Sequence, residues 1–226
     1  MEQGRREGNG RPALRAVVWD MDGTLIDSTR AVPDAYITAI LRRGGPRYSR
    51  DEIIAAYSLG PPRLMLTELL GRPATDDDVE EYHARLRANA PGALPYPGIV
   101  DTLEALRGRL PLAVFTGAAS PGAHILLEAS GLLPYFQRVV GGDEVEHQKP
   151  APDGILVACA ALGVEPATAA YVGDSPGDLE AARASGALAV AAGWGHFRAG
   201  APADLVLSSP QELLTVLEEV PGRRRA

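Results

Sequence analysis

Two carboxylates stand two residues apart in the stretch VVWDMDGTLIDS, which covers residues 17–28. The apolar run AVVW predicts a short interior strand, and the glycine that follows predicts its end, so Asp20 and Asp22 are expected at the carboxyl end of that strand. Ligands of parallel α/β sheets bind at this edge. Two acidic groups crowded there repel each other unless a cation or a shared proton lies between them. The pattern therefore predicts a metal site.

Further polar residues follow other apolar runs and complete a candidate phosphate site. Thr116 and Gly117 come after LAVF, Lys149 lies in a loop, and Asp174 and Asp178 come after AAYV. Carboxylate oxygens at neighbouring strand ends suit Mg²⁺, a hard cation that takes one or two carboxylates beside substrate phosphate. A lysine and a hydroxyl beside the metal would neutralise and orient the oxygens of a transferring phosphoryl group.

The two carboxylates of the first motif suit two different roles. A carboxylate is a competent nucleophile toward phosphorus, so Asp20 could form an aspartyl-phosphate intermediate. Asp22 could donate a proton to the leaving oxygen and later take one from water. Lys149 is the only lysine among 22 cationic side chains, which indicates a position that requires a compact ammonium group. The alternative interpretation is a surface lysine without a role.

Alternating strand and helix patterns predict the elements that hold these residues. Strands are expected at 16–19, 112–116, 138–140, 169–173, 187–191 and 205–207, with helices near 99–107, 122–130, 154–162, 179–184 and 210–219. This alternation predicts the α/β class, with a doubly wound, Rossmann-like parallel sheet. The segment 29–93 has helical patterns and no convincing strand, so an inserted helical-bundle cap is expected there. The expected division is a core of residues 12–28 and 94–220, a cap of residues 29–93, and disordered termini at 1–11 and 221–226.

Composition limits the partners of the protein. The formal net charge is −7 at pH 7, and basic residues cluster only near the two chain ends, so nucleic acid is not an expected partner. The chain contains neither a run of about 18 apolar residues nor a signal-peptide pattern, so no membrane partner and a cytoplasmic location are expected. A monomer or homodimer is expected.

The motifs resemble those of the haloacid dehalogenase-like phosphatases, in particular the phosphoglycolate phosphatase-like branch with a small helical cap. DMDGTLIDS, VFTG, QKPAPDG and VGDSPGDLEAARASG occur in the family's order, and the resemblance extends from about residue 14 to 219. The resemblance implies that Asp20 is the nucleophile and Asp22 the general acid and base. It also implies phosphoryl binding by Thr116, Gly117 and Lys149, and Mg²⁺ binding by Asp20, Asp22 and Asp174. Asp178 is implied to be either a further metal ligand or a residue that anchors the metal site. The family commonly has Asn where this chain has Gly117.

The family contains several chemistries, and the residues favour one of them. Phosphonatases need a cap lysine, which residues 29–93 lack, and dehalogenases lack the aspartate that stands here at position 22. One alternative is a β-phosphoglucomutase-like sugar mutase, although the sequence STRAVPDA after the first motif lacks the histidine typical of such mutases. Another is a catalytically silent module that binds a phosphorylated ligand.

The resemblance therefore favours a Mg²⁺-dependent phosphatase that acts on a small phosphomonoester. The candidate substrates are phosphoglycolate, a sugar phosphate and a phosphorylated specialised metabolite. In this architecture the cap covers the leaving group, so cap residues are expected to select it. The expected residue is Arg63, which follows the turn Gly60-Pro61-Pro62.

Overall fold

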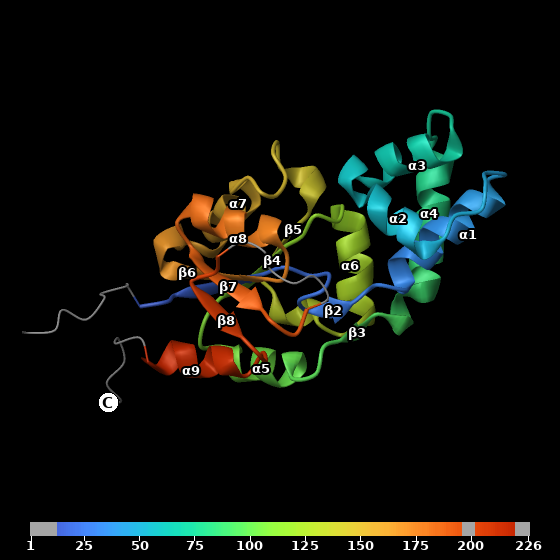
Figure 1. Cartoon of the computed structure of the whole chain (residues 1–226). Helices are drawn as coiled ribbons and strands as arrows, with labels where there is room; N and C mark the ends of the chain where they lie inside the picture. The colour runs from blue at the N-terminus through green and yellow to red at the C-terminus, as the bar shows by residue number, and fades with distance from the viewer. Residues whose placement is uncertain (1–12, 196–201, 220–226) are drawn as a thin grey trace, which may run out of the picture.

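The computed structural model describes residues 13–195 and 202–219 and consists of an α/β core and a helical cap (Figure 1). The core is a six-stranded parallel sheet with the order β5-β4-β1-β6-β7-β8, which confirms the predicted doubly wound fold. Its strands are β1 (Ala16–Trp19), β4 (Leu112–Phe115), β5 (Arg138–Val140), β6 (Ala169–Gly173), β7 (Leu188–Ala192) and β8 (Leu205–Leu207). The termini predicted to be disordered lie outside the described residues.

Alternate residues of the buried strands supply two apolar layers, one on each face of the sheet. Val17 and Trp19 of β1 belong to the layer formed with α5 (Ile99–Leu106), α6 (Ser120–Ala129) and α9 (Glu212–Glu219). Val18 belongs to the opposite layer, with α7 (Asp153–Leu162) and α8 (Pro176–Ser185). Because side chains alternate along a strand and both faces are covered, the central strands are apolar throughout.

The cap consists of four α-helices within the predicted segment. They are α1 (Ala31–Arg42), α2 (Arg50–Ala55), α3 (Pro62–Leu70) and α4 (Asp76–Asn89), with short 3-10 turns η1 (Ala56–Leu59) and η2 (Ala90–Gly92). Helices α1 and α4 pack together, and the rings of Tyr36 and Tyr82 stack between them with centroids 4.0 Å apart. Capping boxes at Ser49 and Thr75 start α2 and α4, because each side chain accepts the N–H of the third helical residue.

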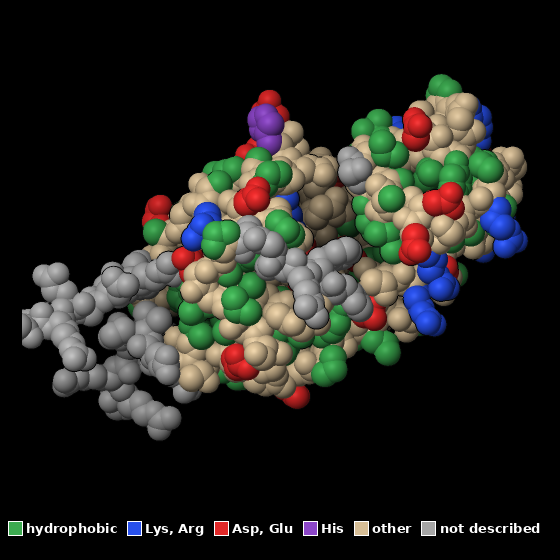
Figure 2. Space-filling view, viewed as in Figure 1, with side chains coloured by type: hydrophobic (Ala, Val, Ile, Leu, Met, Phe, Trp, Pro, Cys, Tyr) green, Lys and Arg blue, Asp and Glu red, His purple; other side chains and the backbone are tan. Residues whose placement is uncertain are grey.

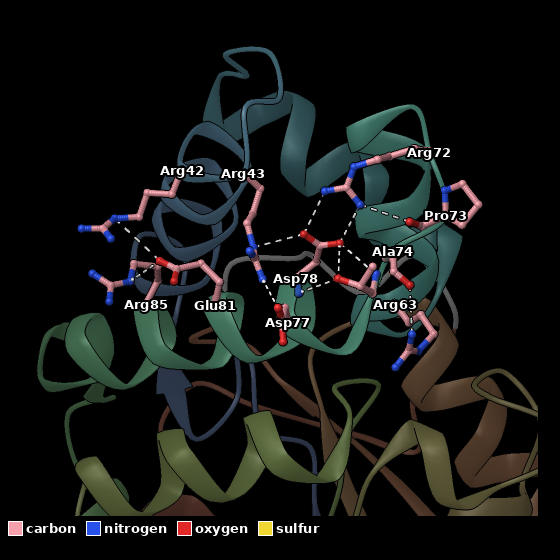
Figure 3. A network of polar contacts seen from close by, with 11 residues as sticks. Arg42, Arg43, Arg63, Arg72, Pro73, Ala74, Asp77, Asp78, Glu81 and Arg85 are labelled. Atoms are coloured by element: carbon pink, nitrogen blue, oxygen red, sulfur yellow. Dashed lines mark hydrogen bonds and ion pairs between the residues drawn. The ribbon is translucent and has the colours of Figure 1, made fainter.

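Asp78 connects three parts of the cap through buried polar contacts (Figure 3). Its carboxylate accepts hydrogen bonds from Arg72 Nη1 at 2.7 Å and Nη2 at 3.0 Å, and Arg43 Nε lies 3.1 Å away. Arg43 follows α1, Arg72 follows α3, and Asp78 lies in the first turn of α4. Hydrogen bonds from Arg72 hold the pKa of Asp78 well below its usual range. The carboxylate therefore stabilises the mutual packing of the cap helices.

Two short strands join the cap to the core. Strand β2 (Ile26–Asp27) pairs antiparallel with β3 (Leu94–Pro95), so the chain leaves and re-enters the core at adjacent points. This pair had no clear sequence pattern because each strand has two residues. Helix α6 begins at Ser120, two residues before its predicted start, with Pro121 in its first turn. Within the described residues, no helix has the length and apolar character needed to span a membrane.

Candidate active site

Three central strands end in polar residues at one edge of the sheet. Asp20 follows β1, and its backbone N–H donates to the carbonyl of Val172 in β6 at 2.8 Å. Thr116 follows β4 and Asp174 follows β6, which are the two neighbours of β1 in the sheet. The strand order therefore brings residues from three distant segments together, as their positions after strands predicted.

Lys149 is buried among carboxylates and aromatic rings. Its Nζ lies 2.5 Å from Asp20 Oδ1 and 2.7 Å from Asp178 Oδ1, and only 13% of its side chain is exposed. The ring centroids of Phe115 and Tyr171 lie 4.9 and 5.4 Å from Nζ. Burial acts to lower the pKa of Lys149, but Asp178 and Asp20 outweigh it and raise the pKa above its usual range. The surface-lysine interpretation is therefore wrong, and this ammonium group is charged.

The carboxylates of Asp20, Asp174 and Asp178 form a cluster suited to a metal ion. One oxygen from each lies within 4.8 Å of the others, and all three residues are buried. Burial, followed by repulsion from Asp178, raises the pKa of Asp20 well above its usual range despite the opposing charge of Lys149. Burial also acts to raise the pKa of Asp178, but Lys149 outweighs it and lowers that pKa. Three carboxylates thus share one ammonium group. A set of oxygen donors with excess negative charge fits Mg²⁺, so the residues present match the implied cofactor.

Glycines allow the loops to approach Asp174 closely. Gly23 has a φ of 83°, and a Cβ there would stand 2.4 Å from Asp174 Oδ2. A Cβ on Gly195 would stand 2.4 Å from Asp174 Cβ. Trp194, beside that glycine, donates from Nε1 to the carbonyl of Thr24 at 2.9 Å. Any side chain at either glycine would displace Asp174, so these positions keep the carboxylate in the cluster.

Asp22 lies outside the cluster of Asp20, Asp174 and Asp178, and its role as a metal ligand stays a prediction. Its carboxylate accepts a hydrogen bond from the Ser28 hydroxyl, and Thr116 Oγ1 lies 3.5 Å from its other oxygen. Burial raises the pKa of Asp22, while the hydrogen bond from Ser28 opposes that shift. Its place outside the carboxylate cluster and the hydrogen bond from Ser28 suit a group that carries a proton.

Thr116 and Gly117 line the cavity beside these carboxylates. The backbone N–H of Ala118 donates to Thr116 Oγ1 at 3.1 Å, which fixes the hydroxyl at the start of the loop. No atom lies within 4 Å of the position that a Cβ on Gly117 would occupy. Apart from the two neighbouring residues, a Cβ at this position would therefore have no close contact.

Ser175 and Tyr171 anchor Asp178 through hydrogen bonds. Its Oδ2 accepts hydrogen bonds from the backbone and hydroxyl of Ser175 at 3.0 and 2.6 Å, which form the capping box of α8. The Tyr171 hydroxyl donates to its Oδ1 at 3.0 Å. Ser175 could be identified as a helix N-cap from its place before Pro176. Tyr171 had no sequence signal that distinguished it from other buried strand residues. Ser28, which contacts Asp22, was likewise unmarked by spacing or type.

A cavity of about 410 Å³ lies between these core residues and the cap. Figure 2 shows the hollow between the two parts, with hydrophobic side chains along its cap edge. Arg63 does not line it: its guanidinium donates to Ala74 O at 3.0 Å and contacts the exposed carboxylate of Asp76. Pro61 and Pro62, at the start of α3, line the cavity instead, and the Arg63 guanidinium lies beside Ala74 (Figure 3). The contact between Arg63 and the substrate therefore stays a prediction that the cavity lining does not support.

Carboxylates at central strand ends beneath an inserted helical cap indicate an enzyme of the doubly wound α/β class. A family model described as haloacid dehalogenase-like hydrolase matches residues 14–186. The chain therefore belongs to the haloacid dehalogenase-like hydrolase family, as its motifs predicted.

Relatives and solved structures agree with this membership. The chain is 36% identical over 219 residues to "Probable phosphatase IndB" of Dickeya dadantii (strain 3937), with 93% of each chain covered. It is 31% identical over 210 residues to phosphoglycolate phosphatase of Escherichia coli (strain K12), covering 81% of this chain and 82% of the other. The structure of CbbY from Rhodobacter sphaeroides in complex with phosphate has a TM-score of 0.78 and 26% identity, covering 91% of this chain and 99% of that one.

Proposed function

We propose that the protein is a Mg²⁺-dependent phosphatase that hydrolyses a small phosphomonoester through a phosphorylated Asp20. The observation that carries this proposal is the separation of the site carboxylates into two settings. Asp20 lies in the cluster with Asp174 and Asp178 and contacts Lys149, whereas Asp22 lies outside that cluster. A nucleophile held by cations beside a separate carboxyl that can carry a proton matches the needs of two-step phosphoryl transfer.

In the first step, a carboxylate oxygen of Asp20 attacks the phosphorus atom. The bond from phosphorus to the ester oxygen breaks, and the leaving oxygen takes the proton of Asp22. Lys149 and the Thr116 hydroxyl bind the phosphoryl oxygens and stabilise the charge that develops on them. Asp20 and Asp174 would hold Mg²⁺, with Asp178 beside them. Bound there, the ion would withdraw negative charge from the phosphoryl oxygens.

In the second step, Asp22 is a carboxylate and takes a proton from a water molecule. That water attacks the phosphorus atom of the aspartyl-phosphate, which releases inorganic phosphate and restores both carboxyl groups. The Ser28 hydroxyl donates a hydrogen bond to Asp22, so the proton carrier keeps its position between the two steps. The similarity to relatives named as phosphatases and to a structure in complex with phosphate supports this scheme.

The two alternatives from the sequence make different products. A sugar mutase would return phosphate to a sugar, and a silent binding module would release none. Release of inorganic phosphate from p-nitrophenyl phosphate with Mg²⁺, lost with Asp20→Asn, is the expected result. Absence of release from any phosphomonoester would contradict the proposal. Cytoplasmic location and a monomeric or dimeric state stay predictions from the sequence.

A further inference from the structure

The wall of the cavity opposite the carboxylates has no charged side chain among the described lining residues. All charged lining residues belong to the catalytic floor. The cap and the segment at the start of α6 supply the opposite wall. Its larger side chains are apolar or aromatic: Val32, Tyr36, Ile54, Tyr57, Met65, Tyr82, Leu86 and Leu126. Four of these, Tyr36, Met65, Leu86 and Leu126, are at most 3% exposed, so they are packed against other residues behind the wall surface.

Tyrosines give this wall its limited polar character. The rings of Tyr36 and Tyr82 stack, and burial raises the pKa of both hydroxyls above their usual range, so both are neutral. Tyr57 and Tyr82 line the same cavity as Asp22, the proton carrier. Neutral hydroxyls can donate single hydrogen bonds, but they do not replace a cation opposite a carboxylate.

The wall therefore discriminates by charge. A leaving group with a carboxylate or a second phosphate would place a negative charge against apolar side chains with no described cationic partner, which is unfavourable. An apolar group would gain from contact with the same side chains. A cavity of about 410 Å³ is of the size that holds a small organic ligand.

We propose that the preferred substrate is the phosphomonoester of an uncharged, largely apolar or aromatic alcohol, whose organic group packs against the cap tyrosines and aliphatic side chains. This inference rests on the proposed phosphatase function and specifies its substrate class. It distinguishes the chain from an enzyme for phosphoglycolate, whose leaving group carries a carboxylate.

The test compares pairs of substrates that differ only in a remote charge. Hexyl phosphate is paired with its ω-carboxylated analogue, and benzyl phosphate with its para-carboxylated analogue, so that the chemistry at phosphorus stays nearly the same within a pair. The uncharged member is expected to have the larger kcat/KM by at least about tenfold, because leaving a charge unpaired outweighs small differences in contact. Equal or larger kcat/KM for the carboxylated members would overturn the inference while leaving the phosphatase function intact. No phosphate release from any of the four compounds or from p-nitrophenyl phosphate would overturn the function itself.

A cap variant tests whether this wall is the source of the preference. Ile54→Lys places a cation on a partly buried lining position, and Leu64→Lys places the same cation on α3 at a residue that is 55% exposed and outside the lining. Ile54→Lys is expected to reduce the preference within each pair by at least about tenfold, whereas Leu64→Lys is expected to retain it. An unchanged preference in folded Ile54→Lys would contradict the assignment. The wild-type comparison decides the substrate class even if that variant does not fold.

Discussion

Replacing Lys149 with arginine keeps the charge but changes the shape of the cation. In the structure, Nζ lies 2.5 Å from Asp20 and 2.7 Å from Asp178, beside the rings of Phe115 and Tyr171. A guanidinium is larger and planar, and its donors lie in a fixed fork. It could contact both carboxylates only if one of them, or a ring, moved. We therefore expect Lys149→Arg to displace the nucleophile.

The size of the effect follows from the tolerance of such a site to displacement. A shift of ~1 Å in a reacting group can reduce the rate by on the order of 10²-fold. The expected fall in kcat is at least about tenfold, which corresponds to about 1.4 kcal/mol of lost transition-state stabilisation. Retention of the charge avoids the much larger destabilisation, about 3 to 5 kcal/mol, expected when one partner of a buried ion pair is removed. Lys149→Arg should therefore remain folded.

Steady-state hydrolysis of p-nitrophenyl phosphate with saturating Mg²⁺ measures this effect, and thermal unfolding checks the fold. Arg63→Lys is the matched control, because it makes the opposite exchange at an exposed ion pair outside the cavity. Its kcat and KM should equal those of the wild type. Wild-type kcat in Lys149→Arg would refute the reasoning, because it would show that the shape of this cation is unimportant.

Three further predictions concern the metal, the proton carrier and the cap. Removal of divalent metal by a chelator should abolish activity, and added Mg²⁺ should restore it. The Asp174→Asn variant should need a higher Mg²⁺ concentration for half-maximal activity. Full activity after thorough chelation would exclude a role of a metal ion in catalysis. Ser28→Ala removes a hydrogen bond that favours the carboxylate of Asp22, so the pKa of Asp22 should rise and the alkaline limb of the pH profile of kcat/KM should move to higher pH. A limb that stays in place or moves to lower pH would contradict the assignment of Asp22 as the acid. Asp78→Asn should cost about 1 to 3 kcal/mol and lower Tm by roughly 3 to 10 °C with little change in kcat. Because the folded-state pKa of Asp78 is lowered, its stabilisation is complete above the unfolded-state value of about 4 and is lost below it, so the difference in Tm should shrink in acid.

The core of the site was predictable because its residues follow strands. A parallel sheet brings the ends of β1, β4 and β6 to one edge, so the positions of Asp20, Thr116 and Asp174 after apolar runs were sufficient to group them. Lys149 was also identified as a candidate because it is the only lysine in the sequence. In these cases a local pattern and a general property of the fold determine the position of the side chain.

The cap residues that line the cavity could not be predicted from the sequence, because they depend on which face each helix turns toward the core. Arg63 was chosen for its charge and its place after a turn, but its guanidinium pairs with Ala74 and Asp76. The tyrosines that line the cavity come from α1, η1 and α4, and no spacing connects them. The two-residue strands of the junction and the contact between Ser28 and Asp22 likewise arise only from tertiary packing.

The central claim is that phosphate passes through Asp20 before it reaches water. Its most direct test is the stereochemical course at phosphorus, measured with a thiophosphate ester made chiral by oxygen isotopes. Transfer to Asp20 and then to water consists of two in-line displacements, each of which inverts the configuration, so net retention is expected. Net inversion would show a single displacement by water and would contradict the role of Asp20 as the nucleophile.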